Sequence, residues 1–369
     1  MHALTGTGGL YKGYRRSILE KRRIQYIDIA KGIAMICIVL GHLGNSQINQ
    51  VVFTFHVPIF FFITGYFINT KLSIKDFIKN KARTLLFPYI FTCLVIIILA
   101  TLEYQIFMGS TAARQAFSEW IYAAIYGAGD SYSHPFYIKA IGALWFLWAT
   151  FWGSIFLRML LTVQKAGIRI IMVLVLFITG YWSRNLFWFP FSIQAGCCAT
   201  LFIYFGYLLR ISKEFFKKIP VETKTAGTIF VLAIWIDFIR NFQSFWLVHC
   251  DIGRGVIDIA GCICGCYIVI LISWYIGNHA HIISSGLSFL GRYSLFMLCI
   301  HNTELNIFPW QRVTQKLIGY GMPGYLQLYL IITGKLIVII TCTIACAHCN
   351  IIRKIFGMPP VERKMKKYE

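Results

Sequence analysis

The sequence is poor in charged residues, and acidic residues are the scarcest of them. Only 13% of the 369 residues are charged, and 14 aspartates and glutamates stand against 35 lysines and arginines. Soluble domains carry about 25% charged residues, whereas 58% of this chain is hydrophobic, with a mean hydropathy of +0.66. A soluble domain of this length could not bury so much apolar surface. The composition excludes a soluble globular protein and indicates a polytopic membrane protein.

Long apolar runs recur along nearly the whole chain. A helix crosses a bilayer with about 20 predominantly apolar residues, and runs near that length extend from residue 27 to residue 348. They predict an all-α fold, a polytopic integral membrane helix bundle with about ten transmembrane helices. The expected spans are residues 27–43, 48–69, 85–105, 141–161, 168–182, 191–209, 226–241, 256–276, 287–302 and 326–348.

Basic residues are distributed unevenly between the two sides that these spans define. If the N-terminus lies inside, most of the 35 lysines and arginines fall in cytoplasmic segments. This bias is the positive-inside pattern, and it predicts that both termini are cytoplasmic. The chain then divides into a basic N-terminal segment, residues 1–23, a transmembrane domain, residues 24–352, and a basic tail, residues 353–369. Because topology explains the net charge of +21, we expect a lipid bilayer as partner and no nucleic acid.

Three further features are missing from the sequence. No small-residue cleavage site closes the first apolar run, so we expect a retained span and not a signal peptide. No internal repeat is evident, which leaves an inverted-repeat transporter without support. Most of the 12 cysteines fall inside expected spans, where they serve as small apolar side chains. Because their spacing does not suit a zinc site, we expect no metal.

Two histidines interrupt neighbouring apolar runs near the N-terminus. His42 ends the first run and His56 lies in the second. Ionisable side chains inside spans are costly and mark candidate functional sites by default. On a helix, Asp28, Lys31, Met35, Ile38 and His42 fall on one face, because Lys31 and His42 are separated by three full turns. That face would carry Lys31 near the cytoplasm and His42 near the outer side, roughly 16 Å apart along the axis.

Each histidine has a chemical and a structural interpretation. An imidazole titrates near neutral pH and can take a hydroxyl proton as a general base, which makes His42 a candidate base. His42 could equally be a packed helix-end histidine bonded to a backbone carbonyl. His56 precedes Pro58, whose missing N–H frees a carbonyl that this histidine could satisfy. A structural use of His56 is therefore open as well.

Two polar segments accompany these spans. The inside loop, residues 71–83, carries Lys79, Lys81 and Arg83 beneath the face of Lys31, where they could grip the phosphates of a nucleotide. The longest outside stretch, residues 106–140, mixes tryptophan and tyrosine with carboxylates. Such a mixture suits sugar binding, although tryptophan and tyrosine also anchor membrane interfaces.

Several stretches resemble the membrane acyltransferase-3 family, and within it the branch similar to fucose 4-O-acetylases. They are RIQYIDIAKGIAMICIVLGH (23–42), FHVPIFFFITGY (55–66), KARTLLFPY (81–89), ALWFLWATFW (143–152), YFGYLL (204–209) and LGRYSLFMLCIH (290–301). The resemblance implies an O-acyltransferase of the cell inner (plasma) membrane. Such an enzyme moves acetyl from cytoplasmic acetyl-CoA to a hydroxyl of a cell-surface glycan or of its lipid-linked precursor. Acetyl-CoA is then the acyl donor, and no cofactor is bound permanently.

The resemblance also implies roles for the polar residues of the first spans. His42 would be the catalytic histidine that ends a basic-x10-His motif, and His56 would be a second catalytic-site histidine lining the centre beside it. Lys31 is the basic member of that motif, where the family often has arginine. Lysine keeps the charge but not the bidentate grip on a phosphate. Asp28 would pair with Lys31 or orient a charged group.

The remaining carried-over residues would bind substrate. Lys79, Lys81 and Arg83 stand where the wider family has a paired-arginine motif and would meet acetyl-CoA, and His301 matches a recurrent late-helix histidine without a specified role. The expected mechanism is general base catalysis by His42, with a covalent acetyl-histidine relay as a variant. Two alternatives stay open: a transporter or flippase with histidines as a proton relay, and a succinyl or longer acyl donor.

Overall fold

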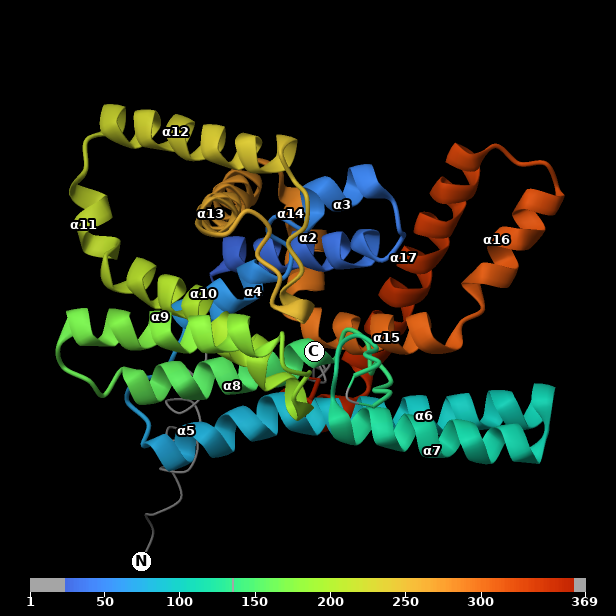
Figure 1. Ribbon diagram of the computed structural model, residues 1–369. Helices are drawn as coiled ribbons and strands as arrows, with labels where there is room; N and C mark the ends of the chain where they lie inside the picture. Colours follow the sequence, from blue (N-terminus) through green and yellow to red (C-terminus); the bar gives the residue numbers. More distant parts are fainter. Residues whose placement is uncertain (1–23, 135, 362–369) are drawn as a thin grey trace, which may run out of the picture.

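The computed structural model describes residues 24–134 and 136–361, and within them the fold is helical (Figure 1). A single isolated bridge, between Tyr132 and Ile138, is the only β-type pairing in this part of the chain. The helices are α2 (Gln25–Gly41), α3 (Ser46–Val52), α4 (Pro58–Tyr66), α5 (Ile74–Lys81), α6 (Phe87–Met108), α7 (Ser110–Tyr126), α8 (Trp145–Leu160), α9 (Ala166–Ser183), α10 (Ile193–Ile211), α11 (Lys213–Lys218), α12 (Val221–Arg240), α13 (Val256–His279), α14 (His281–Arg292), α15 (Ser294–Ile307), α16 (Trp310–Gly319), α17 (Gly324–His348) and α18 (Asn350–Ile355). The predicted all-α membrane bundle is confirmed.

The number of helices that could each cross a membrane unaided is smaller than predicted. Five stretches of the described chain are long and apolar enough: Ile74–Met108, Ala166–Ser183, Pro190–Ile211, Val256–His279 and Gly324–His348. A sixth arises if α14 and α15, which meet at a 71° bend, are taken as one broken span. The expected helices at α2 and α8 are present but have only 17 and 16 residues. The α12 helix carries acidic and basic residues towards both ends.

Two expected spans are interrupted, and the expectation that each is one continuous helix is wrong. Residues 48–69 form α3 and α4, joined by a turn over residues 53–57 that contains His56. Pro58 occupies the first turn of α4, where a missing N–H costs nothing and the fixed φ favours a helix start. Residues 287–302 are divided between α14 and α15 at Tyr293.

Two segments expected to be loops are helical. The basic segment 71–83 forms α5, which continues through the π-helical turn η1 (Ala82–Leu86) into α6. The outside stretch 106–140 contains α7, which packs against α6. Gly109 alone joins α6 to α7 with φ +89°, a conformation that side chains rarely adopt. The terminal segments 1–23 and 362–369, on which the cytoplasmic placement of both termini rests, lie outside the described residues.

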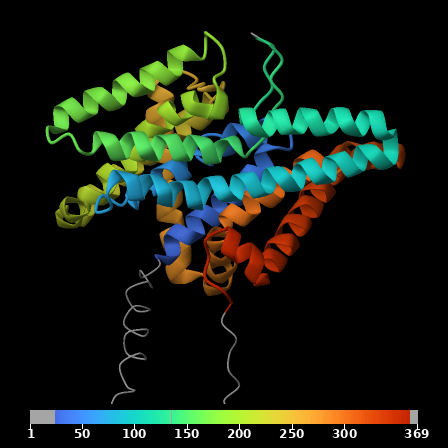
Figure 2. The same cartoon turned by 90° about the horizontal axis from the view of Figure 1, so that it is seen from below.

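The helix α2 lies inside the bundle, between α12 and α13 on one side and α6 and α7 on the other (Figure 1). It packs against α13, α14 and α15. A Cβ atom at Gly32 would lie 2.2 Å from the carbonyl oxygen of Leu287, so the backbones of α2 and α14 are in direct contact. This close approach brings α15, which follows α14, beside the end of α2 that carries His42. The view turned by 90° shows α6 and α17 on the same flank of the bundle (Figure 2).

Candidate functional site

His42 caps the C-terminal end of α2 and is exposed. Its Nδ1 atom lies 2.8 Å from the carbonyl oxygen of Ile38, one turn earlier in the helix. A carbonyl can only accept, so Nδ1 carries the hydrogen and the lone pair of the neutral ring is on Nε2. The two interpretations of His42 are therefore compatible: the carbonyl bond holds the ring, and the nitrogen needed by a general base stays available.

His301 from α15 is the neighbour of His42 across the helix interface. The two rings are 4.9 Å apart between centroids, at 74° to each other. Nε2 of His301 lies 3.3 Å from Nδ1 of His42, although the two residues are 259 positions apart in the chain. The side chain of His301 is fully buried. The structure thus brings together two of the residues singled out in the sequence and gives His301 a defined contact.

Glu304 contacts His301 on the side of the ring that faces away from His42. It lies one turn after His301 on α15, and its Oε2 atom is 3.1 Å from Nδ1 of His301. Lys335, from the middle of α17, donates to Oε1 of Glu304 at 2.7 Å, and both side chains are at most 5% exposed. The indole N–H of Trp310 on α16 also donates to Glu304. Lys335 balances the buried carboxylate, which would otherwise be very costly in this apolar surrounding.

These contacts define one consistent set of hydrogen positions. The carboxylate of Glu304 accepts from Nδ1–H of His301, so the lone pair of the neutral His301 ring is on Nε2. That lone pair faces Nδ1–H of His42, which is shared between His301 and Ile38. Glu304 therefore orients His301, and His301 orients His42, in the way that a carboxylate orients a catalytic histidine. No three His, Cys, Asp or Glu side chains in residues 24–134 and 136–361 are grouped so as to hold a metal ion.

The opposite end of α2 holds an ion pair at the mouth of a small cavity. Nζ of Lys31 donates to Oδ1 of Asp28 at 3.2 Å, so the expected pairing of these residues is present. Lys31, Met35 and Ile38 line one cavity of about 160 Å³, together with side chains of α4, α8 and α15. The three residues therefore share the predicted face of α2. Lys31 and Ile38 line the same cavity, and the carbonyl of Ile38 holds His42.

His56 is placed differently from His42. Its Nδ1 atom lies 2.6 Å from the carbonyl oxygen of Val52, and the side chain is 5% exposed. Phe53 packs edge-on against the ring, with 4.7 Å between centroids. No hydrogen bond among the described residues joins His56 to a charged group. This arrangement is the structural use that the sequence left open for His56, with a different carbonyl from the one freed by Pro58.

The basic residues expected to meet the donor lie on α5 and η1. Lys79 and Arg83 are exposed, and Lys81 is half-buried with its ammonium group 5.7 Å from the centre of the Phe77 ring. Leu85 of η1 lines the same cavity as Lys31, and Lys81 lies about one turn before Leu85. The basic helix is therefore beside the Lys31 cavity, without a direct contact between these three cations and His42.

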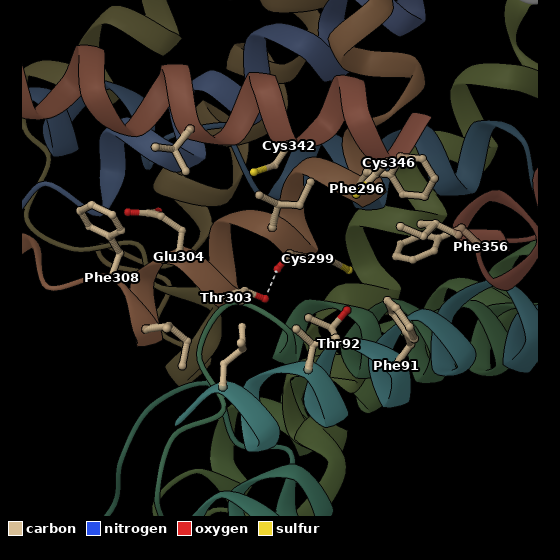
Figure 3. A pocket seen from close by; sticks show the side chains of 16 residues that line it. Phe91, Thr92, Phe296, Cys299, Thr303, Glu304, Phe308, Cys342, Cys346 and Phe356 are labelled. Carbon is tan, nitrogen blue, oxygen red and sulfur yellow. Dashed lines mark hydrogen bonds between the residues drawn. The ribbon is translucent and has the colours of Figure 1, made fainter. Parts of the chain in front are cut away.

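A second, larger cavity of about 420 Å³ lies on the other side of α15, between α6, α17 and α18. Figure 3 shows Glu304 and Phe308 at one end of it and Cys346 and Phe356 at the other. Glu304 is the only charged side chain in its lining, which is otherwise formed by apolar groups, threonines and cysteines. An apolar cavity in this position does not suit a phosphate-bearing donor.

Glu304 and Lys335 are the site residues that sequence reasoning missed. Lys335 lies inside the expected span 326–348, and a charged residue inside a span is a functional candidate on that ground alone. Glu304 also follows His301 by three residues, a spacing that places both on one helix face. These two signals were present in the sequence, whereas the pairing of α15 with α17 was not.

This chain is similar to known proteins over most of its length. Residues 24–348 match the model of the acyltransferase-3 family, which is described as an acyltransferase domain. The nodulation protein NolL of Mesorhizobium japonicum is 26% identical over 159 residues, which cover 39% of this chain and 38% of NolL. NolL of Sinorhizobium fredii is 28% identical over 137 residues, covering 33% and 32% of the two chains. The chain thus spans about a third of each curated relative. No solved structure matches.

Proposed function

This chain belongs to the acyltransferase-3 family, and from that premise we propose that it transfers acetyl from cytoplasmic acetyl-CoA to a hydroxyl of a cell-surface glycan or of its lipid-linked precursor. It is a multi-pass membrane acyltransferase. In this proposal the protein resides in the inner (plasma) membrane, Lys31 faces the cytoplasm, and His42 is the general base near the outer side. The fucose 4-O-acetylase-like branch remains a prediction.

The observation that carries the proposal is the anchored ring of His42. Nδ1 is held by Ile38 and His301, so that Nε2 is left with its lone pair on an exposed side chain. A packed structural histidine has no need of a second histidine and a buried ion pair behind it. A general base does, because the group behind it fixes the tautomer and stabilises the imidazolium that forms during the reaction.

The donor end of the proposal rests on Lys31. Lys31 lines the cavity of about 160 Å³ together with Met35 and Ile38 of the same helix. Phosphate groups of acetyl-CoA would contact Lys31 together with Lys79, Lys81 and Arg83 of the adjoining helix. The uncharged arm and its thioester would then enter the cavity, whose lining is largely apolar. Asp28 keeps the Lys31 side chain in place through their ion pair.

His42 has the same protonation state before and after the chemical step. As the acceptor oxygen forms a bond to the thioester carbonyl carbon, Nε2 of His42 takes the hydroxyl proton. The tetrahedral adduct collapses with cleavage of the C–S bond, and the imidazolium returns the proton to the CoA thiolate. The products are an acetyl ester and free CoA thiol. In the covalent variant, Nε2 attacks the thioester carbon and the C–S bond breaks to release CoA thiolate; the acceptor oxygen then takes the acetyl group from Nε2, and the hydroxyl proton passes to the thiolate, so that the products are the same.

Replacing His42 tests this function directly. We expect His42→Ala to lower acetyl transfer by about 10²- to 10⁴-fold, measured as acetyl content of surface glycans in cells and as acetyl-CoA cleavage by the purified protein. His348→Ala is the matched control, because His348 is also an exposed helix-end histidine with Nδ1 2.8 Å from a carbonyl one turn earlier. Equal activities of the two variants, at equal membrane expression, would overturn the assignment.

A further inference from the structure

Three segments meet beyond the His42 end of α2 and form a cluster of aromatic and polar side chains. They are the turn over residues 53–57, the connection 127–144 between α7 and α8, and the connection 241–255 between α12 and α13. We call the side chains that they contribute the outer cluster, which consists of Phe53, Asp130, Tyr132, Trp246 and His249. In the proposed topology this cluster lies on the outer side.

His249 is held at the centre of the outer cluster by both of its nitrogens. Nε2 lies 3.0 Å from Oδ2 of Asp130, and Nδ1 lies 3.1 Å from the hydroxyl of Tyr132. The ring of Tyr132 stacks on the buried Trp188, with 5.0 Å between centroids and 8° between planes. Trp246 stacks on His249 itself at 5.7 Å and 26°. The cluster is thus a fixed arrangement and not a group of independent surface side chains.

Phe53 connects the outer cluster to His56 and to the end of α2 that carries His42. Its ring is 5.7 Å from that of Trp246 and 4.7 Å from that of His56. A Cβ atom at Gly41 would lie 3.1 Å from Cε2 of Phe53, so this ring packs directly against the residue that precedes His42. One aromatic ring therefore separates Trp246 from the backbone at His42.

The connection 127–144 also contacts the helix that carries His301. The side-chain amide of Asn302 donates to the carbonyl oxygen of Ile141 at 3.0 Å. Because Asn302 follows His301 directly, this connection is fixed to the same short stretch of α15 that orients His42. The outer cluster is thus attached to both helices of the reaction centre.

The exposed parts of the outer cluster match the two kinds of surface on a sugar ring. Trp246 is 42% exposed and the carboxylate side chain of Asp130 is 51% exposed. A pyranose has an apolar face of C–H groups and a rim of hydroxyls. The indole suits the C–H face, and the carboxylate accepts hydrogen bonds from hydroxyls. The contact between Asp130 and His249 holds both groups in place at the exposed end of the cluster.

A second exposed tryptophan shows what a plain membrane anchor looks like in this fold. Trp182, near the end of α9, is 66% exposed. It has no ring partner among the described aromatic contacts. Trp246, in contrast, lies tilted against the ring of Phe53 and stacks on that of His249. An interface anchor needs only an indole at the headgroup level. Trp246 is instead built into a cluster with a carboxylate, an imidazole and a phenol.

We propose that the outer cluster binds one pyranose ring of the acceptor, with Trp246 stacked on the ring and Asp130 bonded to its hydroxyls, while His249 holds these two side chains in place. The inference rests on the proposed function, since it names the acceptor side of the same reaction centre. A ring seated on Trp246 directs a neighbouring sugar hydroxyl past Phe53 to Nε2 of His42. The ring belongs either to a polysaccharide or to a lipid-linked sugar, and these two sources share the same chemistry.

The test separates acceptor binding from the reaction itself. The purified protein in liposomes is given acetyl-CoA and one of two acceptors from cells that lack this protein: their surface polysaccharide or their extracted lipid-linked sugars. Two rates are measured, acetyl transfer to the acceptor and cleavage of acetyl-CoA without acceptor. We expect Trp246→Ala to raise the KM for the working acceptor by about tenfold and to leave acceptor-independent cleavage unchanged. Trp182→Ala, the matched control, leaves both rates unchanged.

Each outcome decides between the inference and the function beneath it. An unchanged acceptor KM in Trp246→Ala, or an equal rise in Trp182→Ala, would overturn the sugar site while the acyltransferase assignment stands. If His42→Ala keeps both rates, the proposed function fails instead. Trp246→Phe and Asp130→Asn are the controls for a loss of folding. Trp246→Phe keeps an aromatic ring and should raise the acceptor KM less than Trp246→Ala does. Asp130→Asn raises it without changing acetyl-CoA cleavage.

Discussion

His42 and His56 have nearly the same local geometry and very different surroundings. In both, Nδ1 lies close to the carbonyl oxygen of the residue four positions earlier, at 2.8 Å for His42 and 2.6 Å for His56. His42 is exposed and continues through His301 to a buried ion pair. His56 is 5% exposed and packs against Phe53. The carbonyl bond alone therefore does not distinguish the proposed base, His42, from His56.

The difference between these two regions comes from residues far away in the chain. His301 is 259 positions from His42, and Lys335 lies 31 positions beyond Glu304. They place a buried chain of polar contacts behind Nδ1 of His42, whereas Nε2 of His42 has no partner among the described residues. In the α3–α4 turn, an aromatic ring takes the place of the second histidine. Substitutions that remove or keep these distant groups are the sharpest tests of the comparison.

Glu304→Gln should have the largest effect among the supporting residues. Glutamine cannot hold the negative charge that stabilises the His301–His42 pair when His42 takes a proton, so we expect kcat to fall by about 10²-fold. The KM for acetyl-CoA should stay close to that of the native protein, because Lys31 and its cavity are untouched. Initial rates of acetyl transfer at varied acetyl-CoA concentrations measure both quantities.

A paired substitution controls for the loss of folding in this experiment. Glu304→Gln leaves Lys335 as an unpaired buried cation, which costs about 3–5 kcal/mol. Combining it with Lys335→Met removes the second charge, so the double variant should regain thermal stability without regaining kcat. Recovery of kcat along with stability would show that Glu304 acts only as a structural partner of Lys335.

His56→Phe should affect stability more than activity. The substitution keeps a ring next to Phe53 but leaves the carbonyl of Val52 without its donor, at a cost of about 1–3 kcal/mol. We expect kcat to change by no more than about threefold, because His56 is not connected to the ion pair. Thermal unfolding in detergent and acetyl transfer at saturating acetyl-CoA provide the two readouts. A fall in kcat comparable to that of Glu304→Gln would instead make His56 a second catalytic histidine.

Local periodicity predicted the features that depend on a single helix. Lys31, Met35 and Ile38 share one face and one cavity because the helical repeat alone fixes their directions. The breaks at residues 53–57 and at Tyr293 were not predicted, since apolar composition is the same in a continuous span and in two short helices. Pro58 was the only local signal of the first break, and it marks a helix start as readily as a kink.

The partners of the candidate site could not be predicted in the same way. Contact between His42 and His301 requires α14 to lie directly on α2, and Gly32 and Gly291 permit this because neither has a side chain in the interface. Small residues occur in many spans, so they do not reveal which helices meet. Lys335 lies in an apolar run and could have signalled a buried anion, but only the packing of α17 on α15 identifies that anion as Glu304.

Lys31→Gln should have the smallest effect, and it addresses the opposite end of α2. Lys31 is half-buried and already paired with Asp28, so its contribution to donor binding is that of one charge-assisted hydrogen bond, reduced by solvent. We expect the KM for acetyl-CoA to rise by about five- to tenfold. The kcat should stay within about twofold, because the contact of Lys31 with the donor is the same in the ground state and in the transition state.

Lys75→Gln is the control, because Lys75 is an exposed lysine on α5 that is not among the residues lining the cavity. Lys31→Arg should keep or lower the KM, since a guanidinium can hold a phosphate with two parallel bonds. If Lys31→Gln lowers kcat with an unchanged KM, then Lys31 influences His42 through the bundle, and the separation between a donor end and a base end of α2 is wrong.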